Sequence, residues 1–590
     1  MKHISTFVLR IEEVLAGAML IAISALVFLS AIARTIGMPI NWAQDISLLF
    51  FAWLTFIGAD IVAKTGNLIR IDMLEKRFPK PVRKTLALIF DVAMLLFLLI
   101  LIVYGFLLVS QSWYRSFQTL KMSYAWCTLS VPVGALLLIF TIGSKFIKDI
   151  RTPMIEWGIT DAGAIGFFLV ILFLGMPVAF AIAVSGFAFF LTRPEIPWTI
   201  LVQRSLSTTQ SFTMLAIPLF IFAGNLMNNT GITSRLVKLA NVLTGHMYGS
   251  IGQVSVVLST LMGGVSGSAV ADAAMECRIL GPEMTQRGYA PGWAAAVNCL
   301  SGLIVATIPP SMGLILYGTV GEVSIGRLFV AGFVPGIIMC ILMMGATSWS
   351  ARHYGYKPDH EKPSSAAEIG KACIESIWAL MFPVLLIIFI RFGVMTPSES
   401  GAFAVFYALF VGIFIYKELD MKKFKECLVS SVKDLSVTTM ILAFSGIFSY
   451  GVVFDQLPAT LTNILIAVTS NKYLLLFLVI LMLVAFGMFM ETTVITLICT
   501  PILVPLIQKY GIDPVHFGII MMTVVTMGCS TPPVGVALYT CSNIMGCSVE
   551  ETTKYSIPYF VAILGTLAVC IFLPQVVLFL PNLVYGGAGF

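Results

Sequence analysis

Apolar runs of about 18 residues or more recur along the whole chain, and this is the length needed to cross the hydrocarbon core of a membrane. The 590-residue sequence is 58% hydrophobic and only 11% charged, with a mean hydropathy of +0.97. Soluble domains carry about 25% charged residues, so this chain cannot cover a water-facing surface. These properties exclude a soluble enzyme, a nucleic-acid-binding protein and a disordered protein. They predict an all-α polytopic membrane protein.

The N-terminal region, 1–150, contains four of these apolar runs, at about 14–33, 43–63, 86–110 and 128–147. Lysine and arginine gather between Lys64 and Lys84 and at both ends of this region, so the positive-inside rule places both ends in the cytoplasm. We therefore expect 1–150 to form a four-helix unit. A polar linker at 151–160 then leads into a larger part, 161–590.

The larger part contains two copies of one unit. Certain prolines and glycines are each followed, at one constant offset, by the same residue type; in the first copy these are Pro282, Gly288, Pro291, Pro309, Pro310 and Pro335. Their partners in the second copy are Pro505, Gly511, Pro514, Pro532, Pro533 and Pro558. The constant offset, which relates Pro282 to Pro505, is called the repeat register below. With only 48 glycines and 27 prolines in the chain, such a constant offset is not expected by chance. We place the two repeats at about 161–375 and 376–590.

Each copy holds an apolar segment with two consecutive prolines, at Asn298–Gly318 and Met527–Cys541. Two prolines remove two backbone donors and clash with the preceding turn, so a helix must break there. Exposed carbonyls at membrane depth are tolerated only where they line a cavity or bind a cation. Upstream of each break lies a stretch of small and hydroxyl residues, Gly263–Asp272 and Gly487–Thr496, with the pattern of a re-entrant hairpin. Paired broken helices of this kind are typical of secondary transporters with inverted repeats.

Two ionisable residues lie in these small-residue stretches. Asp272 and Glu491 have apolar surroundings, and a functional role is the default hypothesis because burying a charge is costly. For Asp272, a structural ion pair with a nearby arginine is an equal alternative. Glu491 occupies the repeat position of Ser268 and is expected beside a substrate or cation, or else as the cap of the following helix. Elsewhere, the spacing of Thr396 and Glu399 predicts a capping box.

Several segments resemble a known family. GVSGSAVADAA and IPPSMGLILYG in the first copy, TPPVGVALY in the second, and the segments Ile217–Met227 and Thr396–Leu409 resemble the large membrane subunit of tripartite ATP-independent periplasmic (TRAP) transporters. The N-terminal region resembles the small membrane subunit of that family through Trp42 and Asp45, among others. Three positions depart from the family pattern: Asp45 stands where Glu is expected, Asn67 where His is frequent, and Glu491 where Asp is common.

The resemblance implies a fused permease of the bacterial inner membrane, in which a four-helix scaffold is joined to an inverted-repeat transport unit that moves like an elevator. It implies a periplasmic substrate-binding protein that delivers an organic acid anion, sodium ions that enter with the anion, and contact with membrane lipids. Neither nucleic acid nor an organic cofactor is expected. The substrate stays open between C4-dicarboxylates, sialic or other sugar acids, and 2-oxo acids. Fused members carry an extra linking helix, for which Asp149–Asp161 is too short.

The resemblance and the repeat pattern together indicate candidate site residues. Substrate contacts are expected from Ser266, Ser311, Glu491 and Thr492. Sodium is expected to be held, partly through backbone carbonyls, by Ser268, Pro310, Gly313, Thr531, Pro532 and Gly535. The alternative for the serines is an ordinary one, because hydroxyls in membrane helices often bond to the carbonyls of their own helix.

Other functions stay open on the sequence alone. Proton coupling through Asp272 or Glu491 would use the same fold, and paired broken helices also occur in channels. The GxSG string at Gly264–Gly267 is also found around the nucleophile of intramembrane serine proteases. That chemistry needs a histidine within hydrogen-bond reach, and neither His246 nor His516 is well placed for it in the sequence. The chain has no GxxxxGK[ST] string, so we do not expect it to hydrolyse ATP.

Overall fold

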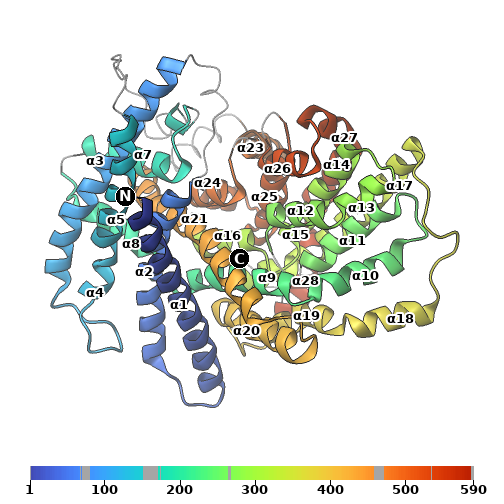
Figure 1. Cartoon of the computed structure of the whole chain (residues 1–590), viewed down its shortest axis with the longest axis horizontal. Helices are drawn as coiled ribbons and strands as arrows, with labels where there is room; N and C mark the ends of the chain where they lie inside the picture. Colours follow the sequence, from blue (N-terminus) through green and yellow to red (C-terminus); the bar gives the residue numbers. More distant parts are fainter. Residues whose placement is uncertain are drawn as a thin grey trace. The chain divides into compact units, whose positions relative to one another are not determined.

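The structure, a computed structural model, is helical throughout the part of the chain that it describes (Figure 1). The described residues are 2–66, 68, 80–149, 170–172, 174–193, 195–263, 267–456, 469, 471–488, 490–532 and 535–586. Within these ranges the chain forms helices and loops, apart from an isolated antiparallel β-bridge between Ser116 and Ser123. Ten of the described helices are long and apolar enough to cross a membrane, or up to 12 if each of two bent helix pairs is one span. The predicted all-α polytopic membrane protein is confirmed.

The four apolar runs of the N-terminal region form four helical spans, as predicted. They comprise α1 (Lys2–Thr35), α2 (Asn41–Thr65), α3 (Lys80–Ser112), and the short α4 (Ala125–Thr128) followed by α5 (Ser130–Asp149). Helix α1 packs on α2, and α5 packs on both α2 and α3. The expected linker, 151–160, lies outside the described residues.

A buried ionic cluster fastens α1 to α2 in this region. Lys64 Nζ lies 2.6 Å from Glu12 Oε1 and 2.5 Å from Asp60 Oδ2. The three side chains are 11%, 5% and 0% exposed, respectively. Thr141 of α5 donates to the other oxygen of Asp60 over 2.5 Å. A lysine shared by two carboxylates keeps these charges paired where water cannot solvate them.

Asp45, one of the residues behind the family resemblance, holds the loop between α3 and α4. Its Oδ2 accepts hydrogen bonds from the backbone N–H and hydroxyl of Thr119, at 2.9 and 2.5 Å, and from the N–H of Leu120 at 3.2 Å. Nearby, the indole of Trp53 donates to the carbonyl of Trp126 over 3.0 Å. These contacts give both residues a structural role in the four-helix region.

Contacts between Cα atoms divide the chain into two compact units. Unit 1 comprises Met1–Leu219 and Leu428–Pro458, and unit 2 comprises Phe220–Cys427 and Ala459–Phe590. Besides the four-helix region, unit 1 includes α7 (Val178–Leu191), α8 (Thr199–Ser207), the 3₁₀ turns η2 (Thr208–Gln210) and η3 (Phe212–Leu215), and most of α21 (Met421–Phe454). The compact units therefore do not follow the sequence boundary between the four-helix region and the larger part.

Long-range contacts explain why α21 belongs to unit 1. The ring centroid of Phe444 lies 5.3 Å from that of Phe97 on α3 and 5.7 Å from that of Phe180 on α7. Lys433 on the same helix lies 3.3 Å from Glu13 on α1, nitrogen to oxygen. One helix from the second copy is thus packed against helices from the start of the chain.

The duplication read from prolines and glycines reappears in the helix boundaries. In the first copy α11 (Ser250–Gly263), α12 (Ala269–Ile279), α14 (Pro291–Ser301), α16 (Met312–Val320) and α17 (Ile325–Tyr354) follow one another. Their equivalents in the repeat register are α23 (Lys472–Gly487), α24 (Thr492–Lys509), α25 (Pro514–Cys529), α26 (Val536–Met545) and α27 (Val549–Phe572). The starts of α12 and α24, and those of α14 and α25, keep the register to the residue. Both copies therefore fold into the same series of helices.

The other described helices of the larger part lie outside these two matching series in the repeat register. They are α9 (Ala216–Asn229), α10 (Ile232–Thr244), α13 (Gly281–Gln286), α15 (Leu303–Thr307), α18 (Ala366–Glu375), α19 (Ile377–Arg391), α20 (Pro397–Phe410), a π-helical turn (Val411–Ile415) and α28 (Pro574–Tyr585). The predicted capping box starts α20: the Thr396 hydroxyl accepts from the N–H of Glu399, and the Glu399 carboxylate accepts from the N–H of Thr396. Its role as a cap is confirmed.

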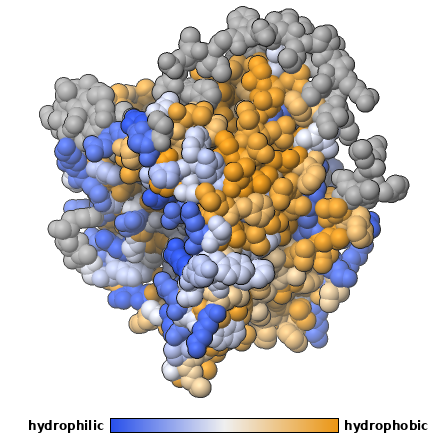
Figure 2. Space-filling view, turned by 90° about the vertical axis from the view of Figure 1, so that its left-hand side faces the viewer, coloured by the Kyte–Doolittle hydropathy of each residue, from blue (hydrophilic) through white to orange (hydrophobic). Residues whose placement is uncertain are grey.

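Large apolar side chains are exposed along the long helices. Leu99 and Val103 of α3 are 51% and 57% exposed, and Phe140 of α5 is 74% exposed. Figure 2 shows one face of the molecule with a broad continuous hydrophobic area beside a more hydrophilic one. An apolar surface of this extent is unfavourable in water and is expected where helices contact lipid.

Candidate functional site

The two predicted helix breaks occur at the double prolines. In the first copy, the segment Pro291–Thr307 and α16 are bent by 43° at residues 308–311, which we call the first break. In the second copy α25 ends at Cys529 and α26 begins at Val536, and we call the described residues between them, 530–532 and 535, the second break. Two adjacent prolines leave no backbone donors to continue the hydrogen-bond ladder, so both helices stop.

The two small-residue stretches also interrupt helices in equivalent places. Between α11 and α12 lie the described residues 267 and 268, which we call the first tip, and between α23 and α24 lie the described residues 488, 490 and 491, which we call the second tip. Ser268 and Glu491 are the N-cap residues of α12 and α24, and Ser311 and Gly535 are those of α16 and α26. Unit 2 therefore contains four helix N-termini at the tips and breaks. Such termini present free N–H groups and the positive end of the helix dipole.

Each tip is hydrogen-bonded to the break of its own copy. In the first copy, the N–H of Met312 donates to the carbonyl of Gly267 over 3.3 Å. In the second, the N–H of Gly535, which occupies the repeat position of Met312, donates to the carbonyl of Met488 over 3.0 Å. The same backbone position therefore joins the break to the tip in both copies.

Gly267 fits this contact because it has no side chain. Its φ is +68°, and a Cβ added to it would lie 2.3 Å from the carbonyl oxygen of Pro310. An L-residue would be strained in this conformation and would collide with the break. The chain therefore brings Pro310 and the residue before Ser268 into direct contact.

The first break also meets the second tip. A Cβ added to Gly313, in the first turn of α16, would lie 1.9 Å from Met522 Cε and 3.8 Å from Thr492 Cγ2. The hydroxyl of Thr492 in turn lies 3.4 Å from the Cys529 thiol, which also donates to the carbonyl of Met490 over 3.3 Å. The start of α16 thus packs against the start of α24 from the other copy.

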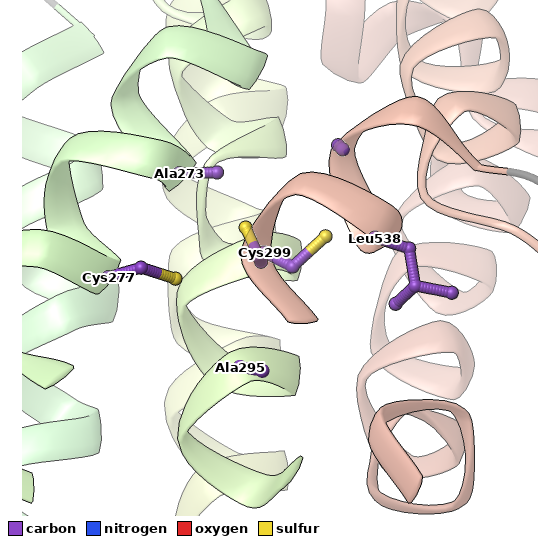
Figure 3. Packing of buried hydrophobic residues seen from close by; sticks show 7 residues of the cluster. Ala273, Cys277, Ala295, Cys299 and Leu538 are labelled. Atoms are coloured by element: carbon purple, nitrogen blue, oxygen red, sulfur yellow. The ribbon is translucent and has the colours of Figure 1, made fainter. Parts of the chain in front are cut away.

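The matching contact joins α12 to α26 (Figure 3). These helices and α14 share a buried apolar cluster made of Ala273, Cys277, Ala295, Cys299, Ala537, Leu538 and Cys541. Figure 1 shows α12 beside α26, in agreement with the contacts between these two helices. Because α12 is equivalent to α24 and α26 to α16, the two cross-copy contacts mirror one another. Tips and breaks of both copies therefore form one assembly within unit 2.

The predicted sodium-site residues lie in the two breaks, at the first tip and, in the case of Gly313, in the first turn of α16. Pro310 is buried, and Ser268, Gly313, Thr531 and Pro532 are half-buried. The hydroxyl of Thr531 donates to the carbonyl of Met527 over 2.6 Å, which leaves the lone pairs of the hydroxyl oxygen as well as the backbone carbonyl of Thr531 as potential ligands. Among the described residues, no group of three or more His, Cys, Asp or Glu side chains could hold a metal ion. A cation in this assembly would take hydroxyl and carbonyl oxygens, the ligands suited to hard cations.

The predicted substrate residues lie in the same assembly, except that Ser266 falls outside the described residues. Ser311 is fully buried and caps α16 by accepting from the N–H of Leu314 over 3.4 Å. Glu491 is half-buried at the start of α24, and its side chain makes no capping hydrogen bond. The alternative role of Glu491 as a helix cap is therefore wrong, and its carboxylate is available for another partner.

Asp272 is fully buried in the first turn of α12, and Arg278 on the same helix is exposed. Placed one helical turn after Ser268, Asp272 brings a carboxylate close to the first tip. The functional role of Asp272 and its alternative role in a structural ion pair both stay predictions.

One polar cluster was not predicted from the sequence. Glu276, one turn after Asp272, is fully buried, and its carboxylate accepts hydrogen bonds from Ser255 (2.6 Å), Ser259 (2.7 Å) and Ser301 (3.2 Å). These serines come from α11 and α14, so the cluster forms when three helices meet. The four-residue spacing of Ser268, Asp272 and Glu276 was the available signal, since such residues share a helix face.

A membrane protein with duplicated helix series and paired helix breaks has the architecture of a secondary transporter. Two family models match the chain: the DctQ component of tripartite ATP-independent periplasmic transporters over residues 23–152, and the DctM component over residues 165–576. The chain therefore belongs to the TRAP transporters and carries both membrane components in one polypeptide.

Similar proteins include a fused permease and separate large permease subunits. The isethionate TRAP transporter permease protein DctMQ of Oleidesulfovibrio alaskensis is 27% identical over 96% of this chain and 94% of its own length. The sialic acid large permease protein SiaM of Vibrio cholerae is 35% identical over 72% of this chain and 99% of its own length. The C4-dicarboxylate large permease protein DctM of Rhodobacter capsulatus is 31% identical over 71% of this chain and 98% of its own length. The predicted fusion of small and large membrane subunits is confirmed, and the chain is a transporter component rather than an enzyme.

Proposed function

We propose that this protein takes up an organic acid anion across the bacterial inner membrane, driven by sodium ions that enter with it. A periplasmic substrate-binding protein would deliver the anion. The observation that carries the proposal is the assembly in unit 2, where each tip is hydrogen-bonded to the end of the break of its own copy and the copies meet through α16 with α24 and α12 with α26. Four helix N-termini and the carbonyls released by two Pro-Pro breaks offer sites for both an anion and a cation.

Sodium would be bound at each tip and break. In the first copy the ligands would come from Ser268, Pro310 and Gly313, and in the second from Thr531, Pro532 and Gly535. Prolines at these positions free the carbonyls of the preceding turn, and oxygen is the ligand that hard cations prefer. Two equivalent breaks support at least one sodium site in each copy.

The anion would lie beside the N-termini of α16 and α24, which pack against each other at Gly313. The N–H groups and hydroxyls of Ser266, Ser311 and Thr492 suit a carboxylate or similar group. The Glu491 carboxylate would repel an anionic group, so it would bind a hydroxyl or amide group of the substrate or stay close to a sodium ion. The names of the similar proteins specify isethionate, sialic acid and C4-dicarboxylates, which are all organic acids.

Movement of the elevator type is the mechanism that we infer for this uptake. Both tips and both breaks belong to unit 2, and the four-helix region belongs to unit 1. A compact unit that carries the whole site can move without dismantling the site. The four-helix region would then be the scaffold.

The test is uptake into proteoliposomes of purified protein, with radiolabelled sialic acid, succinate and isethionate offered separately with a binding protein for each. We expect uptake of one of the three acids, only with both its binding protein and an inward sodium gradient. Thr531→Ala tests the carbonyl argument, because removing the hydroxyl should leave sodium dependence nearly unchanged.

Other outcomes would identify the alternatives. Uptake driven by a proton gradient at equal sodium would overturn sodium coupling and favour Asp272 or Glu491 as the coupling group. Flux that does not saturate and needs no binding protein would indicate a channel. The serine-protease alternative has little support, because His516 Nε2 lies 2.7 Å from the carbonyl of Cys570 and is already engaged there.

A further inference from the structure

The Glu276 cluster is an enclosed polar site in unit 2, separate from the tips and breaks. Glu276, Ser255, Ser259 and Ser301 are all fully buried. The hydroxyl oxygens of Ser255 and Ser301 also lie 2.9 Å apart, and Ser301 is within 3.3 Å of the carbonyl of Asn298. The carboxylate, the three hydroxyls and this carbonyl are thus linked in one hydrogen-bonded network.

No positive charge in the described part of the chain balances this carboxylate. None of the lysine, arginine and histidine residues in the described ranges forms a salt bridge with Glu276. A buried carboxylate without a cation is costly even when hydroxyls donate to it. Binding a proton would remove that cost.

The buried titratable groups near Glu276 are acids or thiols, and the one cation on its helix, Arg278, is exposed. Asp272 and Cys277 lie on the same helix, Cys299 on α14 and Cys541 on α26. Helices α11 and α15 contain no titratable residue, and the acidic residue of α13, Glu283, is exposed. A negative charge on Asp272 would make a second negative charge on Glu276 less favourable.

The second copy shows that the fold does not need this carboxylate. At the repeat positions of Ser255, Ser259, Glu276 and Ser301 stand Leu478, Met482, Cys499 and Val524. Helices α23, α24 and α25 pack together there as α11, α12 and α14 do in the first copy. The same three-helix junction is therefore built once with apolar side chains and once around a carboxyl group.

The spacing of the oxygens is that of a hydrogen-bonded network. The oxygen pairs lie 2.6–3.2 Å apart, which is hydrogen-bond distance.

The network can accept a proton without losing a hydrogen bond. In the charged state, the three hydroxyls donate to the carboxylate. In the neutral state, the new O–H of Glu276 can donate to Ser301 Oγ, whose own hydrogen turns to the carbonyl of Asn298. Ser255 and Ser259 keep their bonds to the carboxyl group in both states.

We propose that Glu276, together with Ser255, Ser259 and Ser301, forms a reversible proton-binding site in the first copy of the transport unit. The site lies two helical turns from Ser268, on the helix face that also carries Asp272. Resting on the proposed uptake function, its role is to make the rate of sodium-driven uptake depend on pH. The proton is bound by the carboxylate oxygen and released to water when the junction opens.

Infrared difference spectroscopy of the full-length protein in lipid tests the site without relying on transport. The wild type should show the carbonyl stretch of a neutral carboxyl group that disappears as pH rises, and Glu276→Gln should remove that band. The exposed Glu283→Gln is the matched control and should retain it. A titrating band of equal amplitude in the wild type and in Glu276→Gln would overturn the proposal.

Ser259→Ala keeps the carboxyl group and removes one donor to it. Because that donor stabilises the charged form, the pH at which the band disappears should rise by about one unit. This variant also decides the matter if Glu276→Gln does not fold, since an unchanged titration in Ser259→Ala would contradict the proposed network.

Uptake at a fixed sodium gradient between pH 5 and 9 gives the functional readout. The rate should vary with pH in the wild type and become independent of pH in Glu276→Gln. Absence of sodium-driven uptake in the wild type would refute the proposed function, whereas the infrared band would still decide the proton site. An unchanged pH profile of uptake in Glu276→Gln would overturn the role assigned to it.

Discussion

Gly267 occupies a position that combines two separate constraints. Its φ of +68° disfavours every L-residue, and its missing side chain leaves room for the carbonyl of Pro310. Gly267→Ala should therefore displace the first tip from the first break and reduce uptake about tenfold or more, because strain and collision both act there. The measurement is initial uptake in proteoliposomes, with the amount of folded protein determined by size-exclusion chromatography.

Gly288 provides the control for this substitution. Its φ is +83°, but no atom lies within 4 Å of the place where its Cβ would be. Gly288→Ala thus introduces similar backbone strain without a collision and should keep most of the uptake. Equal losses in the two variants would show that strain alone, and not the tip-to-break contact, controls activity.

Gly313 tests the contact between the two copies. Its substitution by alanine would place a methyl group against Met522 Cε, so α16 and α24 must separate or the methionine must move. We expect Gly313→Ala to weaken sodium or substrate affinity several-fold, and Gly313→Ala/Met522→Ala to recover most of it. The apparent affinities come from uptake as a function of sodium and substrate concentration. Failure of Met522→Ala to restore affinity would place the effect elsewhere.

The packing of α1 on α2 is stabilised by a buried ionic cluster whose charges can be removed one residue at a time. Lys64→Met would leave the carboxylates of Glu12 and Asp60 buried without a cation and should lower the free energy of unfolding by about 3 kcal/mol. Lys433→Met is the control, because its ion pair with Glu13 is 35% and 17% exposed and should contribute about 1 kcal/mol or less. Denaturant unfolding in detergent measures both.

Neutralising the two carboxylates distinguishes the contribution of the lysine's charge from that of its packing. Adding Glu12→Gln and Asp60→Asn to Lys64→Met should recover much of the loss, since no uncompensated charge then remains. If the triple variant is no more stable than Lys64→Met, the aliphatic packing of the lysine and not its charge fastens α1 to α2.

At the scale of elements, sequence reasoning succeeded where a residue acts on its own backbone. Pro309 and Pro310 break their helix whatever surrounds them, and Thr396 with Glu399 caps α20 through bonds within one turn. Glu276 could not be assigned this way, because its serines lie 17 to 25 residues away on other helices. The contact of Gly313 with Met522 and Thr492 likewise depends on how the two copies pack.

At the scale of the whole molecule, the constant register of prolines and glycines made the duplication readable without any structure. The division into compact units could not be predicted from the sequence, because it depends on contacts between residues far apart in the chain, such as that of Phe444 with Phe97. Those contacts place most of α21 in unit 1 with the four-helix region, although α21 belongs to the second copy in sequence. The roles predicted for the site residues stay predictions.

The separate permease relatives suggest that the fusion can be undone. Residues 1–152 and 165–590, expressed together as two chains, should copurify, because Phe97 and Glu13 of the first chain contact Phe444 and Lys433 of the second. We expect such a split protein to retain uptake at a level within about threefold of the intact chain. Affinity purification through a tag on one chain checks the association, and Phe444→Ala should weaken it. Two chains that never copurify would show that the covalent link is required for assembly.

The reactivity of the buried thiols between the copies depends on whether the two copies stay packed together. Cys277 and Cys299 come from one half and Cys541 from the other, and all three are sealed in the same apolar cluster. An alkylating reagent can modify them only while the halves are parted. Peptide-resolved labelling over time, with and without sodium or substrate, would therefore show whether the two copies stay packed together during turnover, as movement of the whole unit requires.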